Sequence, residues 1–194
     1  MNLLHVDSSA LGTYSVSREL SGAIVDAWMR THPRTQVTYR DVAAQPLAHW
    51  TPATDGSDPS VRVGAEVLEE FLAADVIVIG APMYNFSIPS TLKAWIDRVA
   101  VAGKTFRYGA NGPEGLAGGK RVILASSRGG FYGAGTPRAA FDFQEAYLRQ
   151  VFGFLGVTDI EILRAEGVAL GAEQKAQAIA SAHAAIRANE RLAA

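Results

Sequence analysis

The chain has 194 residues, a length that favours one domain over residues 1–194 with a core of its own. Hydrophobic residues make up 48% of it and the net charge is −1, so nothing in the charge favours nucleic acid or an anionic membrane as a partner. No cysteine is present, which excludes disulfides, thiolate metal sites and thiol catalysis. We find neither a signal peptide nor an apolar run of membrane-spanning length, and we therefore expect a cytoplasmic protein.

The first third of the chain predicts a strand, a helix and an edge strand. Residues 3–6, which are apolar apart from His5, are interpreted as a short first strand. A helix is expected to begin at Ser15, because serine can cap the free backbone N–H groups of a first turn. Val37 and Tyr39 alternate with polar neighbours, which indicates a second strand at the edge of a sheet.

The middle of the chain predicts a loop, a helix and a buried strand. Residues 44–58 are rich in proline and polar residues, and we expect a loop there. Asp58 and Pro59 are typical of a helix start. An apolar stripe follows at Val61, Ala65, Leu68, Phe71 and Leu72. Residues 76–79 are an uninterrupted β-branched run, which indicates a parallel strand buried on both faces.

The last part continues the alternation of helices and strands. Further helices are expected around residues 92–99 and 147–155 and from residue 172 onward, and further strands at 121–125 and 160–163. Residues 103–119 are rich in glycine and are predicted to be irregular, with Phe106, Arg107 and Tyr108 exposed.

Five strands that alternate with helices predict an α/β fold. We expect a doubly wound, five-stranded parallel sheet in the flavodoxin-like order 2-1-3-4-5, with helices on both faces. In that order the loops after the first, third and fourth strands converge at one edge of the sheet. Ligands of open α/β sheets bind outside the carboxyl ends of the strands, so these loops form the candidate site.

The loop after the first strand has the chemistry of a phosphate site. Ser9, Ser15, Val16 and Ser17 place three hydroxyls and several backbone N–H groups at a helix start, where the helix dipole favours an anion. Arg18 is close by. Taken alone, the serines would more often be simple helix caps, and it is the convergence with two other loops that favours a ligand.

The other two loops have the properties of a ring-binding site. Met83, Tyr84, Asn85 and Phe86 combine apolar surface with amide groups, although aromatic residues of a loop can also fold back into the core. The loop after the fourth strand contains Ser127, Arg128, Gly129 and Gly130. Its glycines allow close approach of the backbone to a ligand, and its polar side chains can add donors. A glycine pair can also be a mere tight turn. A planar ring with polar edges and one phosphate describes FMN better than a dinucleotide.

Other classes of site find no support in the sequence. No G-x-G-x-x-G motif follows the first strand, and no G-x-S-x-G motif is present. Residues 115–121 resemble a P-loop, but Arg121 takes the Ser/Thr position and the segment precedes a strand. The four histidines have no metal-ligand spacing, so we expect no metal site. We interpret His5 and Asp7 as structural residues near the site.

Several segments together resemble the FMN-dependent NADH-azoreductases, the flavodoxin-like NAD(P)H quinone and azo reductases of bacteria. They occur in the family's order over nearly the whole length: residues 7–9, 15–17, 81–86, 105–108, 112–116, 127–130 and 152–156. The segment 131–141 departs most from the family pattern, which leaves the acceptor preference open.

The resemblance implies a role for each loop. Ser9 and residues 15–17 would hold the FMN phosphate and ribityl chain, and residues 83–86 and 127–130 would hold the ring. It also implies a homodimer with active sites at the interface, which passes hydride from NADH or NADPH through flavin N5 to a quinone or azo acceptor in a ping-pong sequence. We expect no obligate catalytic side chain, with Tyr84 as a possible proton donor and Phe106, Phe131 and Tyr132 beside the open ring face. The rival hypothesis is a flavodoxin-like electron carrier or a redox-sensing flavin-binding module.

Overall fold

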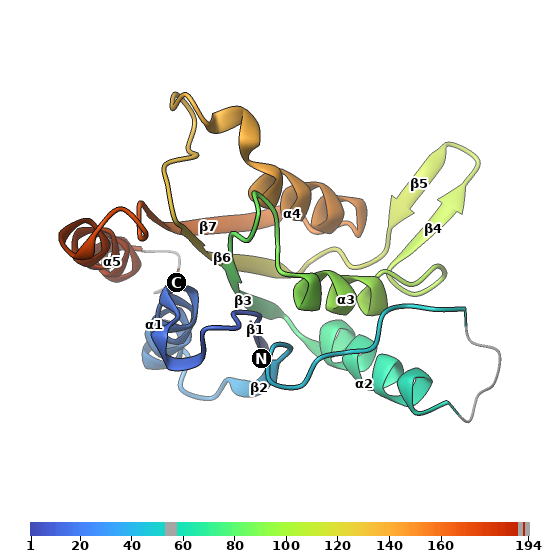
Figure 1. Ribbon diagram of the computed structural model, residues 1–194. Helices are drawn as coiled ribbons and strands as arrows, with labels where there is room; N and C mark the ends of the chain where they lie inside the picture. Colours follow the sequence, from blue (N-terminus) through green and yellow to red (C-terminus); the bar gives the residue numbers. More distant parts are fainter. Residues whose placement is uncertain (53–57, 190–191, 193–194) are drawn as a thin grey trace.

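The computed structural model describes residues 1–52, 58–189 and Leu192. Its centre is a five-stranded parallel sheet in the order β2-β1-β3-β6-β7, which is the predicted order 2-1-3-4-5 (Figure 1). The strands of this sheet are β1 (Asn2–Asp7), β2 (Gln36–Asp41), β3 (Val76–Pro82), β6 (Arg121–Arg128) and β7 (Asp159–Glu166). The flavodoxin-like topology predicted from the sequence is therefore confirmed.

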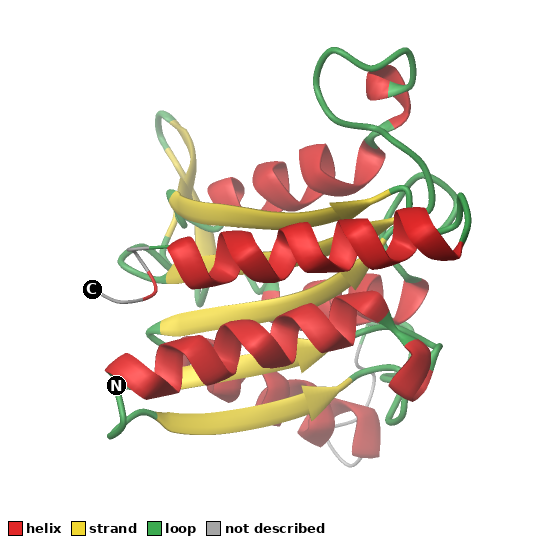
Figure 2. Cartoon of the chain, turned by 90° about the vertical axis from the view of Figure 1, so that its left-hand side faces the viewer, coloured by secondary structure: helices red, strands yellow, loops and turns green. Residues whose placement is uncertain are grey.

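Helices cover both faces of the sheet. The helices are α1 (Val16–Thr31), α2 (Pro59–Ala73), α3 (Ser90–Val99), α4 (Phe143–Phe154) and α5 (Ala172–Ala188), with short 3-10 turns η1 (Gly12–Tyr14) and η2 (Ala139–Phe141). Helices α1 and α5 pack on one face, where they lie in front of the sheet in Figure 2, and α2, α3 and α4 pack on the other. Each face has its own apolar core against the same strands.

The burial of each strand follows its place in the sheet. All seven residues of β3 are buried, as expected of a central parallel strand that carries helices on both sides. Strand β2 pairs with β1 alone and is mostly exposed, which confirms the predicted edge strand. The predicted helix starts are also confirmed, because the side chains of Ser15 and Asp58 accept hydrogen bonds from the backbone N–H groups of the first turns.

The predicted irregular segment 103–119 contains an antiparallel hairpin, so that prediction was wrong. Strands β4 (Phe106–Gly109) and β5 (Gly112–Gly115) pair outside the main sheet and project from the body (Figure 1). Arg107 and Glu114 form a cross-strand ion pair, and the Phe106 ring packs 4.7 Å from the Phe154 ring. Glycine and proline interrupt the alternation by which a strand is recognised in sequence, and for this reason the hairpin was missed.

The predicted loop over residues 44–58 includes residues 53–57, which lie outside the described part of the chain.

The apolar stripe predicted on α2 coincides only in part with the buried face of the helix. Val67 and Phe71 are its buried residues, whereas Leu72 is exposed.

The base of the hairpin meets the end of α4 through two glycines in contact. A Cβ atom on Gly115 would lie 2.1 Å from the backbone nitrogen of Gly156, and Gly156 itself has a positive φ of 95°. This contact leaves no room for a side chain at either position.

We therefore expect Gly115→Ala to lower the free energy of unfolding by about 1–3 kcal/mol, the usual cost of forcing extra volume into a packed site. The measurement is denaturant unfolding of the purified protein. Gly109→Ala in the same hairpin is the matched control, because its Cβ would lie 3.7 Å from the nearest atom, an ordinary contact. Equal losses in the two variants would contradict the steric explanation.

Candidate functional site

The three loops predicted to converge are in direct contact at the carboxyl edge of the sheet. Strand β3 lies between β1 and β6, so the loops that follow these strands are neighbours. The Tyr84 hydroxyl accepts a hydrogen bond from the backbone N–H of Ala10 (3.1 Å) and lies 3.2 Å from Ser9 Oγ. On the other side, the backbone N–H of Met83 donates to the carbonyl of Ser127 (2.8 Å). The loop after β3 is therefore bonded to both of its companions.

The first loop gathers serine hydroxyls at the start of α1. Ser9, Ser15 and Ser17 are all buried, and Ser15 caps the helix by accepting from the N–H of Arg18 (3.3 Å). The hydroxyls of Ser15 and Ser17 lie 3.1 Å apart and bond to each other. Val16, the first residue of the helix, is buried beside them. Hydroxyls and N–H groups at a helix N-terminus are the groups that hold a phosphate.

Arg18 has a structural role in this loop. Its guanidinium donates to the carbonyl of Ser9 (2.8 and 3.1 Å) and forms a bidentate pair with Asp41 at the end of β2 (2.6 and 2.8 Å). The hydrogen bond that Arg18 donates to Asp41 raises the pKa of Arg18, and the same bond lowers the pKa of Asp41. Arg18 thus ties the phosphate-type loop to the edge strand.

Asp7, the last residue of β1, is buried within a polar group, and its predicted structural role stays a prediction. It accepts hydrogen bonds from Ser21 Oγ (2.7 Å) and from the Tyr39 hydroxyl (3.1 Å). Burial, with the Asp7 charge beside it, raises the pKa of Tyr39 to about 12. His5 is buried and its Nε2 lies 2.9 Å from Ser21 Oγ. This polar group fixes the end of β1 against α1.

The second loop is a two-residue turn with a strained backbone. Tyr84 and Ser87 exchange backbone hydrogen bonds (2.9 and 3.0 Å) across Asn85 and Phe86. These two central residues have φ angles of 49° and 71°, in the left-handed region that glycine and asparagine tolerate best. The Phe86 side chain is 47% exposed, so the strain is not repaid by burial of the ring. Strain of this kind gathers at ligand sites.

The third loop contains one side chain that is turned away from the shared edge. Arg128 is only 1% exposed, and its guanidinium bonds to the carboxylates of Asp142 (2.8 Å), Glu145 and Glu166 (3.3 Å). The sequence predicts that the Arg128 side chain offers donors to a ligand, whereas the structure commits these donors to the interior. Arg128 can therefore face a ligand through its backbone, together with Ser127, Gly129 and Gly130.

The sequence reasoning missed Gln144, the residue that joins the ends of β3 and β6 to α4. Its amide donates to the carbonyl of Ala81 (2.7 Å) and accepts from Ser126 Oγ and Arg128 Nε (3.1 and 3.2 Å). Gln144 is completely buried in the first turn of α4. The burial of Gln144 comes from the fold, and its place between Phe143 and Glu145 gives no local sequence signal of this role.

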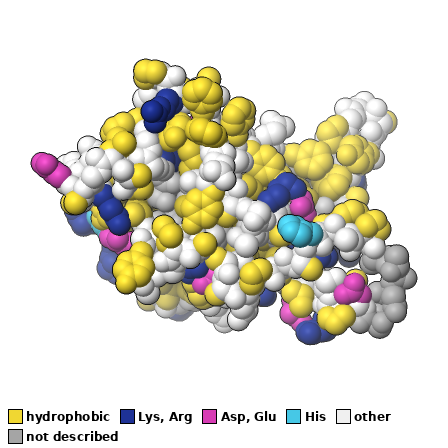
Figure 3. Space-filling model, viewed as in Figure 1, with side chains coloured by type: hydrophobic (Ala, Val, Ile, Leu, Met, Phe, Trp, Pro, Cys, Tyr) yellow, Lys and Arg dark blue, Asp and Glu magenta, His cyan; other side chains and the backbone are white. Residues whose placement is uncertain are grey.

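Aromatic side chains surround the turn on the side of the third loop. The Phe86 ring lies 6.2 Å from the Tyr132 ring and 5.7 Å from the Phe141 ring, and the Phe86 carbonyl accepts from the N–H of Phe143 (3.1 Å). Phe131, Phe141 and Phe143 are exposed. Hydrophobic side chains gather over this loop at the top of Figure 3. Phe141 and Phe143 were not among the predicted residues.

Phe106 was predicted beside this face, and the structure places it elsewhere. Helix α4 begins at the site, through the Phe143–Phe86 hydrogen bond, and its twelve residues carry the chain about 16 Å to Phe154 at a rise of 1.5 Å per residue. Phe106 packs on Phe154 at that far end. It does not flank the site of its own chain.

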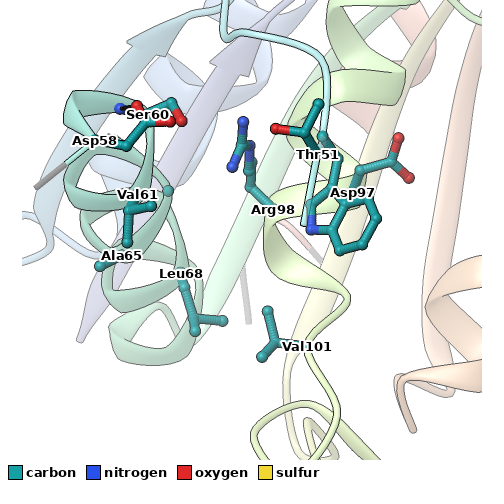
Figure 4. Close-up of a pocket in the computed structure, with 11 residues that line it drawn as sticks. Thr51, Asp58, Ser60, Val61, Ala65, Leu68, Asp97, Arg98 and Val101 are labelled. Atoms are coloured by element: carbon teal, nitrogen blue, oxygen red, sulfur yellow. Dashed lines mark hydrogen bonds between the residues drawn. The ribbon is translucent and has the colours of Figure 1, made fainter. Parts of the chain in front are cut away.

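Two hollows lie between α2, α3 and the hairpin, apart from the three loops. The first, of about 340 Å³, is lined by Val61 and Leu68 of α2, Arg98 of α3 and Trp50, among others (Figure 4). Arg98 there donates to the carbonyls of Ala48 and His49 (3.1 and 3.3 Å). Through these hydrogen bonds, Arg98 holds the segment before α2 against α3.

Within residues 1–52 and 58–189 and at Leu192, no group of three or more His, Asp or Glu side chains is placed to hold a metal ion. Among the same residues, no helix has the length and apolar character needed to cross a bilayer.

The strain at Phe86 leads to a prediction about stability. Phe86→Val is expected to lower the free energy of unfolding by about 1–2 kcal/mol, because a β-branched residue is poorly tolerated at positive φ. Phe86→Gly removes the same ring but relieves the strain, so it should cost less than Phe86→Val in the same denaturant titration. A larger loss in the glycine variant would show that the ring contacts outweigh the strain.

Comparison with known proteins identifies the family. A sequence profile for the flavodoxin-like fold matches residues 1–189. FMN-dependent NADH:quinone oxidoreductase 1 of Xanthomonas axonopodis pv. citri (strain 306) is 61% identical over 192 residues, which cover 98% of this chain and 97% of the relative.

Solved structures agree with this assignment. An azoreductase from Bacillus anthracis str. Sterne superposes with a TM-score of 0.89 at 27% identity and covers 100% of this chain and 99% of its own. An FMN-dependent NADH-azoreductase from Bacillus anthracis str. Ames Ancestor, solved with FMN, shares the fold with a TM-score of 0.86 at 24% identity and full coverage of both chains. The chain therefore belongs to the flavodoxin-like family of FMN-dependent NADH:quinone oxidoreductases, and it is an oxidoreductase.

Proposed function

We propose that this enzyme reduces quinones and aromatic azo compounds with NADH in a ping-pong sequence, in which donor and acceptor use one open face of the cofactor in turn. The observation that carries the proposal is the strained aromatic turn at residues 84–87, bonded on one side to a serine-rich helix start and on the other to a glycine loop. This is the arrangement needed to hold a phosphate at one end and a flat ring at the other.

The first loop fits the phosphate of FMN. The hydroxyls of Ser15 and Ser17 bond to each other, and each hydroxyl carries one proton that can turn toward an anion. The dipole and the N–H groups of α1 add to the attraction. We propose that Ser9 and residues 15–17 hold the phosphate and ribityl chain.

The second and third loops fit a planar ring. The positive φ angles at Asn85 and Phe86 expose backbone and aromatic surface at the shared edge. Gly130 cannot carry a side chain without displacement of its neighbours, because a Cβ there would lie 3.1 Å from Arg138 Nη1 and 3.3 Å from Tyr132 Cε2. We propose that residues 83–86 and 127–130 hold the ring of FMN.

Bound FMN supplies the redox chemistry, which is acceptance of a hydride from NADH and its delivery to the acceptor. The protein's own residues position and enclose the reactants. The centre of the Tyr132 ring lies 6.2 Å from that of the Phe86 ring, and we propose that Tyr132 borders the open face of the FMN ring. The Tyr84 hydroxyl is bonded between the first two loops, so we assign Tyr84 a connecting role and propose that protons come from solvent.

Two further assignments belong to the same proposal. We propose that residues 1–194 act as one FMN-binding domain, because both apolar cores pack on the same sheet. We place the enzyme in the cytoplasm, because a chain without cysteine suits a reducing compartment.

A homodimer with active sites at its interface is the proposed assembly. Trp50 is 57% exposed and Tyr108, on the projecting hairpin, is 76% exposed. Beside them lies the second hollow, of about 590 Å³, which Trp50 and Phe106 help to line. Exposed aromatic residues around a recess are typical of a protein interface.

The function is tested by steady-state turnover of the FMN-loaded protein. We expect NADH oxidation that depends on menadione or a simple azo dye as acceptor. An electron carrier or a redox sensor would bind FMN without such turnover, and that result would contradict the proposal.

The double variant Ser15→Ala/Ser17→Ala should lose FMN affinity at least about tenfold, since hydrogen bonds to a charged group contribute about 1.5 kcal/mol or more each.

The matched control for the serine variant is Asp58→Ala. It removes the cap of α2, where Asp58 accepts from the N–H of Ser60 (2.8 Å), and should cost about 1 kcal/mol of stability like the loss of the Ser15 cap. Its FMN affinity should stay unchanged. If both variants lose FMN alike, the effect is one of helix stability.

The assembly is tested by light scattering after size exclusion. We expect a mass of twice 20.6 kDa for the native chain. Trp50→Asp with Tyr108→Asp should give a monomer, because two charges would be buried without partners at the interface. Val37→Asp on the exposed edge strand is the control and should remain a dimer. A native monomer would rule out the proposed assembly.

A further inference from the structure

A separate hollow lies against the third loop, on the side of the segment 131–142. It measures about 420 Å³ and is lined by Gly130, Phe131, Thr136, Pro137, Arg138 and Leu170. Its walls are mostly apolar, and Phe131 and Leu170 are exposed. Such walls suit a flat hydrocarbon body. At the top of Figure 3, basic atoms stand among the hydrophobic side chains of this region.

Arg138 is the cation of this hollow, and it lies next to the proposed ring site. Its Nη1 would be 3.1 Å from a Cβ on Gly130, so the guanidinium rests on the backbone of a proposed cofactor-binding residue. The Arg138 side chain is exposed. An anion paired with Arg138 would therefore lie beside the edge of the ring.

The nearby carboxylates are committed to other arginines. Asp142 pairs with Arg128 and also caps α4, where it accepts from the N–H groups of Gln144 and Glu145 (3.1 and 3.0 Å). Glu145 itself pairs with Arg128 and with Arg164 (2.6 Å).

Glu166, the third of these carboxylates, is also occupied. It pairs with Arg128 and accepts from the backbone N–H of Tyr132 (2.8 Å). Within the part of the chain that the structure describes, Arg138 has no ion-pair partner. Its charge therefore remains available to a ligand.

The same network holds the segment in place. Glu166 fixes Tyr132 at one end, and Asp142 fixes the start of α4 at the other. Between them the N–H of Thr136 donates to Gly133 and the N–H of Phe141 donates to Arg138 (3.1 and 2.9 Å). The backbone at Arg138 is thus fixed before a ligand arrives, so that only the side chain has to be ordered on binding.

We propose that Arg138 is a specificity-determining residue that selects acceptors with an anionic group on a flat aromatic body, such as a sulfonate or carboxylate on a naphthoquinone. This inference rests on the proposed function, because the hollow adjoins the proposed ring site. The apolar walls take the body and the guanidinium pairs with the anion.

The test compares two acceptors with one ring system, 1,4-naphthoquinone and 1,4-naphthoquinone-2-sulfonate. Arg138→Gln should raise KM for the sulfonate about tenfold, the loss expected for one charge-assisted contact at a partly exposed site, with kcat and the neutral acceptor little changed. Arg138→Lys should retain most of the preference. Arg149→Gln, an exposed arginine of α4, is the control and should behave as the native enzyme.

A binding measurement separates this inference from the proposed function. Calorimetric titration of the FMN-loaded protein with redox-inert naphthalene-2-sulfonate should show binding that weakens about tenfold in Arg138→Gln and at high ionic strength. This result would support the anion site even if neither quinone were turned over. Equal KM changes for both acceptors, a loss of FMN affinity in Arg138→Gln, or no binding of the sulfonate by the native protein would overturn the inference.

Discussion

The site depends on the close approach of β1 and β3 at their carboxyl ends. A Cβ atom on Gly80 of β3 would lie only 2.2 Å from Oδ1 of Asp7, its partner in β1, so glycine at this position leaves room for the Asp7 carboxylate. Asp7 is held in turn by Ser21 of α1 and Tyr39 of β2. Because the strands end side by side, Tyr84 reaches the first loop and bonds to it, and the serine-rich helix start becomes part of the same surface as the aromatic turn.

On the other side of β3, a buried cation organises the third loop. Arg128 sits in the interior among three carboxylates, and removal of one partner from such a group costs several kcal/mol because a charge is left unpaired in a medium of low dielectric constant. The arrangement has two consequences at the surface. It holds the segment after β6 through Glu166 and Asp142, and its three carboxylates pair with Arg128 and Arg164 and not with Arg138. The cation of the hollow beside the site thus has no ion-pair partner among the described residues.

The turn between these two supports, residues 84–87, has a strained backbone that lowers the stability of the folded chain. Phe86 adopts a left-handed backbone conformation with its ring half exposed, which costs free energy that no buried contact of the ring offsets. The turn persists because its ends are fixed: Met83 bonds to the third loop, and the Phe86 carbonyl bonds to the start of α4. A rigid and strained surface of this kind is suited to a flat ligand, since little order remains to be imposed on binding.

The sequence by itself determined the succession of strands and helices, the edge position of β2 and the identity of the three loops, because hydrophobic periodicity and helix caps are local signals. The sheet order followed from the general topology of five-stranded parallel sheets. It also predicted structural roles for His5 and Asp7, and the structure places both in one buried polar group with Ser21. The tertiary structure decided what depends on partners remote in sequence. The hairpin at 106–115 forms by cross-strand pairing and packing on Phe154, Arg128 turns inward because carboxylates from α4 and β7 meet it there, and Phe106 lies a helix length from the site. No local pattern encodes these contacts, since each needs two segments that only the folded chain brings together.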